Sequence, residues 1–199
     1  MSLFVAYFGS ARTHSNLAHH TILLCDRYEG LLDDIFRRRV LARDFSLYLH
    51  APTRTDPAMA PPGMECMYVL SPVPDNRSGI DWRREAAPYF QRIRAVLEER
   101  LLPGLDLSPV TPSFLTPYDF EYTLQSEHGA AFGPEPALRQ SAYFRYHNRS
   151  PDVEGLYLVG AGTHPGAGVP GVLSSARVLD RVVPAPARGR HTVPAGGPG

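Results

Sequence analysis

The chain has 199 residues, 43% of them hydrophobic, and its lysines and arginines number 20, the same as its aspartates and glutamates. This zero net charge gives no electrostatic basis for binding nucleic acid, and two cysteines are too few for a disulfide scaffold or a zinc site. No apolar run reaches the roughly eighteen residues of a membrane span, and none at the N-terminus resembles a secretion signal. We therefore expect a cytoplasmic protein without nucleic-acid partners, whose contact with a membrane is at most peripheral.

The first seventy residues predict mostly strands. Four apolar runs carry this pattern: residues 2–8, 19–25, 46–50 and 67–70. The first two are expected to form a hairpin across the polar loop 9–16. A helix is predicted over 26–39, with Asp26 as its N-cap and an apolar stripe on one face. That stripe consists of Tyr28, Leu31, Leu32, Ile35 and Phe36.

The longest predicted helix spans residues 81–102 and ends at Pro103-Gly104. A further strand near 109–115 leads to a short helix that Thr116 caps, with Pro117 in its first position. Strands and helices do not alternate strictly along the chain. The order favours an α+β fold with an antiparallel or mixed sheet.

The most informative segment is 155–173, GLYLVGAGTHPGAGVPGVL, which holds six of the chain's 17 glycines. Leu156–Val159 predicts a short buried strand, a loop of nearly bare backbone follows, and a helix is expected from Gly171 to about Val183. Its apolar side comprises Val172, Leu173, Ala176 and Leu179. Free N–H groups and the positive end of a helix dipole suit a phosphate, a carboxylate or an electron-rich ring, and glycine lets such a ligand approach the backbone.

The glycines at 166, 168 and 171 match the GxGxxG dinucleotide pattern, but the context argues against that interpretation. Six residues separate Val159 from Gly166, and Pro170 lies inside the match, whereas the fingerprint begins directly after its strand. No second strand follows to complete a βαβ unit. A glycine-rich turn without a ligand remains an alternative.

Two other sets of residues predict no site. His14, His19 and His20 are close in sequence, but adjacent histidines on a strand point to opposite faces, so we expect no metal site. Ser174 and Ser175 follow the glycine loop, yet the chain has no G-x-S-x-G elbow. Their expected role is helix packing and not hydrolysis.

The segment LYLVGAGTHPGAGVPGVLSSA, residues 156–176, resembles the C-terminal signature of the bacterial and fungal phytoene desaturases, FAD-dependent enzymes of carotenoid synthesis. Other blocks resemble that family in the same order. They are SLFV at 2–5, HHTI at 19–22, LDDIF at 32–36, TDP at 55–57, APPG at 60–63, HGAAFG at 128–133 and FRYHNR at 144–149. The resemblance covers about residues 1–183, and its most specific motifs are the glycine segment, HGAAFG and RYHNR.

The resemblance implies that residues 1–154 belong to a substrate domain and that 155–183 form the FAD-contacting strand, loop and helix of an incomplete FAD/NAD(P)-binding fold. The family's N-terminal Rossmann unit, with its true GxGxxG, is expected to be missing from this chain, which would make it a fragment. The tail 184–199 has little to bury and is expected to be disordered.

The resemblance also implies two groups of cofactor-binding residues. Gly160, Ala161, Gly162 and Thr163 match the strand end beside the ribityl and phosphate groups of FAD. Gly168, Val169, Pro170, Gly171 and Val172 match the turn and helix start that face the flavin ring. His164 stands where many related amine-oxidase-like flavoproteins have an acidic residue. The catalytic residues are unknown, because the sequence singles out no residue of this chain as a catalytic acid or base.

Aromatic side chains crowd into the stretch before the glycine segment. They are Phe114, Phe120, Tyr122, Phe132, Tyr143, Phe144 and Tyr146. They either form plain core or line a cavity for a long apolar polyene, with Phe132 and Phe144 as the expected lining residues.

The resulting hypothesis is an FAD-dependent dehydrogenation of C–C bonds in a phytoene-like substrate, with an unidentified electron acceptor. The fragment alone is expected to be inactive and not to retain FAD. The alternatives are another carotenoid oxidoreductase, such as an isomerase or ketolase, and a non-catalytic remnant or apolar-ligand binder.

Overall fold

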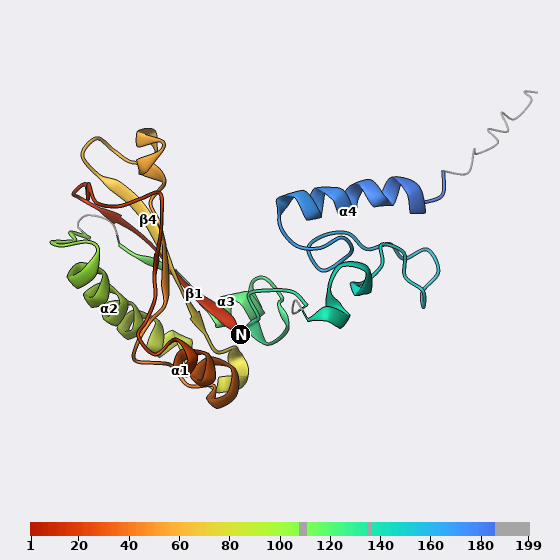
Figure 1. Ribbon diagram of the computed structural model, residues 1–199, viewed down its shortest axis with the longest axis horizontal. Coiled ribbons are helices and arrows are strands. Elements are labelled where there is room, and N and C mark those ends of the chain that lie inside the picture. Colours follow the sequence, from red (N-terminus) through yellow and green to blue (C-terminus); the bar gives the residue numbers. More distant parts are fainter. Residues whose placement is uncertain (108–110, 135–136, 186–199) are drawn as a thin grey trace, which may run out of the picture. The chain divides into compact units, whose positions relative to one another are not determined.

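The computed structural model in Figure 1 describes residues 1–107, 111–134 and 137–185. The chain forms two compact units, Met1–Phe132 and Gly133–Gly199. The described residues between 133 and 154, which the sequence grouped with a substrate domain, therefore pack with the glycine segment. The functional division at residue 154 stays a prediction, and the expected disorder of the tail falls largely on residues 186–199, outside the described residues.

Unit 1 is built on a five-stranded antiparallel sheet with the order β2-β3-β4-β1-β5. The strands are β1 (Ser2–Ser10), β2 (His20–Leu23), β3 (Leu47–His50), β4 (Glu65–Val73) and β5 (Ser113–Leu115). Residues 108–110, part of the predicted strand near 109–115, lie outside the described residues. The sheet together with its helices confirms the predicted α+β class.

The predicted hairpin between the first two strands is wrong, because β3 and β4 lie between them in the sheet. β1 pairs instead with β4 along its whole length, from Ser2 opposite Val73 to Ser10 opposite Glu65. Nearly every residue of β1 is buried. A strand covered on both faces is favoured in the middle of a sheet, where two neighbours satisfy its backbone.

The helix α2 (Trp82–Arg100) packs against the sheet (Figure 1) and contributes five buried side chains to the core, Trp82, Tyr89, Phe90, Ile93 and Leu97. Asp81 caps it by accepting a hydrogen bond from the backbone N–H of Arg83 at 3.1 Å, as its position in the sequence predicts. The buried Tyr89 meets Phe4 edge to face at 5.0 Å, and its hydroxyl lies 2.8 Å from the Ser71 hydroxyl. Burial raises the pKa of Tyr89. The ring and its hydroxyl partner thus fix α2 on the centre of the sheet.

The predicted helix 26–39 is shorter and less regular than expected. It begins as α1 (Tyr28–Asp33) and continues as one π-helical turn, Asp34–Arg38. Arg27, and not Asp26, precedes its first residue, so the predicted cap is wrong. Of the predicted stripe, Leu31 and Ile35 are buried, but Tyr28 and Phe36 are half-exposed. The widened turn rotates Phe36 away from the core.

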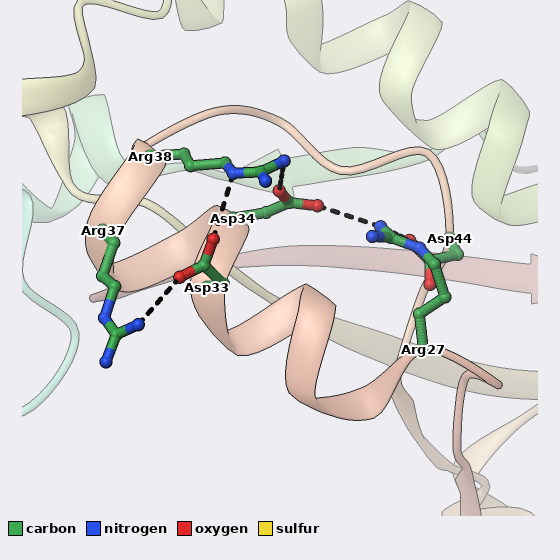
Figure 2. A network of polar contacts seen from close by, with 6 residues as sticks. All are labelled: Arg27, Asp33, Asp34, Arg37, Arg38 and Asp44. Carbon is green, nitrogen blue, oxygen red and sulfur yellow. Dashed lines mark hydrogen bonds and ion pairs between the residues drawn. The ribbon is translucent and has the colours of Figure 1, made fainter.

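Figure 2 shows the ionic network that accompanies this turn. Arg27 bonds to Asp44 at 2.7 Å and to Asp34 at 2.9 Å, and Arg38 reaches Asp33 at 3.0 Å and Asp34 at 3.4 Å. The hydrogen bond to Asp44, followed by that to Asp34, raises the pKa of Arg27. Asp34 is buried, and the two arginines neutralise its carboxylate there.

The helix α3 (Pro117–Tyr122) begins as the sequence predicts. The Thr116 backbone N–H donates to the Asp119 carboxylate at 2.8 Å, and the Asp119 backbone N–H faces the Thr116 side chain in return, which closes a capping box. The Thr116 hydroxyl also donates to the same carboxylate at 2.7 Å. Short 3₁₀ turns complete the described part of the chain. They span Pro52–Arg54, Pro57–Met59, Asn76–Ser78, Glu127–Gly129, Leu138–Gln140 and Ala142–Phe144.

Unit 2 contains the helix α4 (Val169–Val182), which begins two residues before the predicted start. The predicted buried strand Leu156–Val159 is wrong for this chain. Tyr157 makes one isolated antiparallel bridge with Arg149, and Leu156 and Val159 are 42% and 54% exposed. A strand needs a row of bridges, and within the described part of unit 2 this segment forms a single one, made by the backbone hydrogen bonds of Leu156 with Ser150 and of Leu158 with Asn148.

Candidate functional site

A buried asparagine anchors the glycine segment. The Asn148 side chain, 4% exposed, donates hydrogen bonds to the carbonyl oxygens of Leu158 at 3.1 Å and Ser175 at 3.3 Å. Its own backbone carbonyl accepts the Leu158 N–H at 2.9 Å. One residue of the RYHNR block therefore joins the start of the glycine segment to α4.

Ser175 makes the second link between the loop and α4. It is fully buried, and its hydroxyl donates to the Val172 carbonyl at 2.8 Å and accepts the Gly160 N–H at 2.9 Å. The predicted packing role thus includes a specific polar contact. The serine satisfies a backbone donor of Gly160 that a buried apolar side chain would leave unpaired.

The RYHNR block lies alongside residues 160–164. Tyr146 forms a parallel bridge with Thr163, and its carbonyl accepts the His164 N–H at 2.9 Å. The Arg145 guanidinium donates to the Ala161 carbonyl at 2.8 Å. The predicted site residues Gly160–Thr163 are thus held in place by backbone and side-chain contacts with the RYHNR block.

The glycines of the loop have two different roles. A Cβ on Gly171 would lie 2.5 Å from the Gly166 carbonyl oxygen, so the close approach expected there is made by the loop's own backbone. Gly160 and Gly168 have φ of +121° and +88°, and a Cβ on either would meet no atom within 4 Å. These two glycines leave open space beside the backbone, whereas Gly171 is required by the fold of the loop.

The two predicted groups of site residues come together in unit 2. The Gly160–Ser175 bond and the Gly166–Gly171 approach connect the 160–163 segment to the start of α4, which Gly168 precedes without any side-chain cap. Thr163 is buried, and Ala161, Gly168, Val169 and Pro170 are exposed. Exposed backbone at a helix N-terminus attracts negative charge. Contact of these residues with a flavin stays a prediction.

The aromatic residues divide between core and surface. Phe114 packs between Phe4 and Phe90, with ring centroids 5.5 and 5.3 Å away. Phe132 and Phe144 are 61% and 63% exposed, so plain core is excluded for both within the described structure. Tyr122, Tyr143 and Tyr146 are exposed as well. The assignment of Phe132 and Phe144 to a substrate cavity stays a prediction.

The predicted separation of His19 and His20 on opposite faces of a strand is wrong. His19 lies before β2, so strand alternation does not separate it from His20, and the two ring centroids are 4.4 Å apart. His50, which the sequence did not single out, joins them from β3. His14 lies apart and contacts Ser10 at 3.1 Å; burial, with Arg54 and Arg12, lowers its pKa.

Asn148 and Ser175 were also missed as positioning residues. A buried asparagine must find partners for its amide, and its place inside a specific sequence block was the available signal.

Across the described ranges, no helix has both the length and the apolar character that crossing a bilayer requires.

The chain matches no protein-family model. In sequence it is similar to several carotenoid-type desaturases. It is 53% identical over 184 residues to a lycopene-forming phytoene desaturase of Paracoccus sp., covering 92% of this chain and 37% of that protein. It is 47% identical to the neurosporene-forming phytoene desaturase of Rhodobacter capsulatus, covering 92% and 36%. A 4,4'-diapophytoene desaturase of Staphylococcus aureus is 38% identical, with coverage of 92% and 38%.

Among solved structures, an oxidoreductase from Methanosarcina mazei has a similar fold, with a TM-score of 0.50 and 17% identity, covering 90% of this chain and 34% of that one. The chain spans little more than a third of the length of these relatives. Over 92% of its length, the chain is homologous to a C-terminal part of the phytoene desaturases.

Proposed function

We propose that this chain supplies the C-terminal part of an FAD-dependent phytoene desaturase, which dehydrogenates C–C bonds of a long apolar polyene. The observation that carries the proposal is the 53% identity to a lycopene-forming phytoene desaturase over 184 residues. The relatives named above all have desaturase names, so no observation favours the isomerase or ketolase alternatives.

The glycine segment fits a flavin cofactor in its shape and charge. Open space beside Gly160 and Gly168 lets a planar ring or a phosphate approach the main chain, and the uncapped N-terminus of α4 provides a positive dipole end. In this proposal Gly160–Thr163 hold the ribityl and phosphate end, and Gly168–Val172 face the ring. Bound FAD would accept the hydride equivalent.

The other residues of unit 2 position this segment. Asn148 and Ser175 fix the distance between Gly160 and α4, so that both predicted contact groups keep one geometry. The positive end of α4 favours negative charge in front of Val169 and Gly171. Stabilising such charge is the contribution that these backbone groups make to hydride acceptance.

The exposed aromatic side chains of unit 2 fit the substrate's chemistry. Tyr143, Phe144 and Tyr146 are each more than 60% exposed, and apolar area of this kind gains free energy when it contacts a polyene. The proposal includes peripheral contact with a membrane, because so apolar a substrate partitions into lipid.

A chimera tests this function. Residues 1–183 replace the homologous part of the Paracoccus desaturase, and the purified chimera is assayed for flavin absorbance and for dehydrogenation of phytoene. We expect near-stoichiometric flavin and coloured product. A Gly168→Val chimera serves as the matched variant, and it should lose flavin because Val fits neither the positive φ nor the open approach. A folded chimera without flavin would refute the proposal.

A further inference from the structure

Three histidines meet at one edge of the sheet of unit 1. β2 is the edge strand, and His20 on it lies directly opposite His50 on β3. His19 precedes β2 and reaches the same point. One nitrogen from each of the three rings lies within 4.8 Å of the others.

The spacing of these rings suits a shared ion. The Nε2 atoms of His19 and His50 are 2.8 Å apart, and the three ring centroids are 4.4, 4.7 and 5.2 Å from one another. Nitrogens that bind one Zn²⁺ ion at about 2.1 Å are separated by about 3.4 Å in a tetrahedral site. Small rotations of the rings therefore convert the observed contact into coordination.

Neighbouring side chains hold two of the rings by their second nitrogens. His19 Nδ1 is hydrogen-bonded to the Thr55 hydroxyl, and His20 Nδ1 to the Tyr48 hydroxyl at 2.6 Å. Such outer partners are typical of metal-binding histidines, because they fix the orientation of the ring. His20 Nε2 and the facing Nε2 atoms of His19 and His50 are then the donors for an ion, which would replace the contact between His19 and His50.

The cluster offers imidazole nitrogens as its donors, and these bind metals in their neutral form. Neutral nitrogen donors select borderline ions such as Zn²⁺, Co²⁺, Ni²⁺ and Cu²⁺ over Mg²⁺ or Ca²⁺, which prefer oxygen.

We propose that His19, His20 and His50 form a binding site for a divalent transition-metal ion, with Zn²⁺ as the best match. His20 is exposed, which leaves coordination positions open to water on that side. The ion would fasten the edge strand β2 to β3 and to the segment that carries Thr55. The site lies in unit 1 and does not depend on the proposed function.

The test is metal binding by the 199-residue chain, prepared without a histidine tag and stripped with a chelator. Zn²⁺ is titrated in competition with a chromophoric chelator, and Co²⁺ is added separately to record its visible spectrum. We expect one ion per chain, and at least about a tenfold loss of affinity in His50→Gln and in His20→Asn. Circular dichroism checks folding, and the exposed His20 provides the variant least dependent on the core.

His128→Asn is the matched control. His128 is exposed in unit 1 at φ 53°, a conformation that asparagine tolerates, and it should keep wild-type affinity. The proposal is overturned if the wild-type chain binds no Zn²⁺, or if folded His20→Asn and His50→Gln bind it as tightly as wild type. Equal loss in His128→Asn also overturns it, since the ion would then be bound elsewhere.

Discussion

Replacing Asn148 by alanine should loosen unit 2 without affecting unit 1. The change removes the two hydrogen bonds that the amide donates to Leu158 and Ser175. A hydrogen bond contributes about 0.5–1.5 kcal/mol net, so the loss amounts to about 1–3 kcal/mol, or roughly 5- to 150-fold in an opening equilibrium. The half-buried Leu158 carbonyl, which loses the donated amide hydrogen, sets the upper end of this range.

Hydrogen exchange followed by mass spectrometry measures the effect by region. Peptides from 145–176 of Asn148→Ala should exchange at least about fivefold faster than in the wild type, because the opening free energy of this segment falls. Peptides from β1 and β4 should not change. His147→Ala, an exposed neighbour, is the control and should stay within about 0.5 kcal/mol of the wild type. Unchanged exchange in 145–176 would show that Asn148 does not anchor the segment.

Three further outcomes are expected. In Gly171→Ala, the amides of 160–172 should exchange hydrogen faster, because the added Cβ would meet the Gly166 carbonyl oxygen at 2.5 Å and lower the stability of the loop by about 1–3 kcal/mol. Exchange at the wild-type rate would contradict the close approach. The Arg77 hydrogen bond lowers the pKa of the buried Asp75, so this pair stabilises the fold fully above the ordinary carboxyl pKa, and its contribution falls progressively as pH drops below that value towards the depressed pKa. In urea unfolding, the deficit of Asp75→Asn should therefore be larger near about pH 6 than near about pH 3, and a constant deficit would refute the linkage. Phe132→Asp should leave the melting temperature of this chain nearly unchanged because Phe132 is 61% exposed, while the full-length chimera should keep flavin and lose activity; joint loss of folding and flavin would show a core role.

Local signals in the sequence predicted most elements of unit 1. The long helix begins where Asp81 can cap it, and the capping box of Thr116 and Asp119 starts α3. Strand pairing could not be predicted in the same way. The contact of Ser2 with Val73 joins residues far apart in the sequence, and no turn residue specifies it.

In the candidate site, too, local features could be predicted from the sequence and contacts between distant segments could not. The open glycines follow from composition and spacing, but Leu156–Val159 has the pattern of a buried strand and forms only one isolated bridge among the described residues. An apolar run records the preference of the side chains and not the presence of a neighbour. The meeting of His20 and His50 depends on the register of β2 against β3, which sequence spacing alone does not fix.

The Ser175 hydroxyl also determines which residue of α4 can face the glycine loop. It accepts the Gly160 N–H and donates to the Val172 carbonyl one turn earlier in the helix. If α4 slipped by one residue so that Ala176 took this place, the Gly160 N–H would lose its acceptor, because alanine has no hydroxyl. Apolar contacts would tolerate that slip far better than a directional bond does. A single polar side chain thus fixes the register of the helix, and the length of the glycine loop is matched to it.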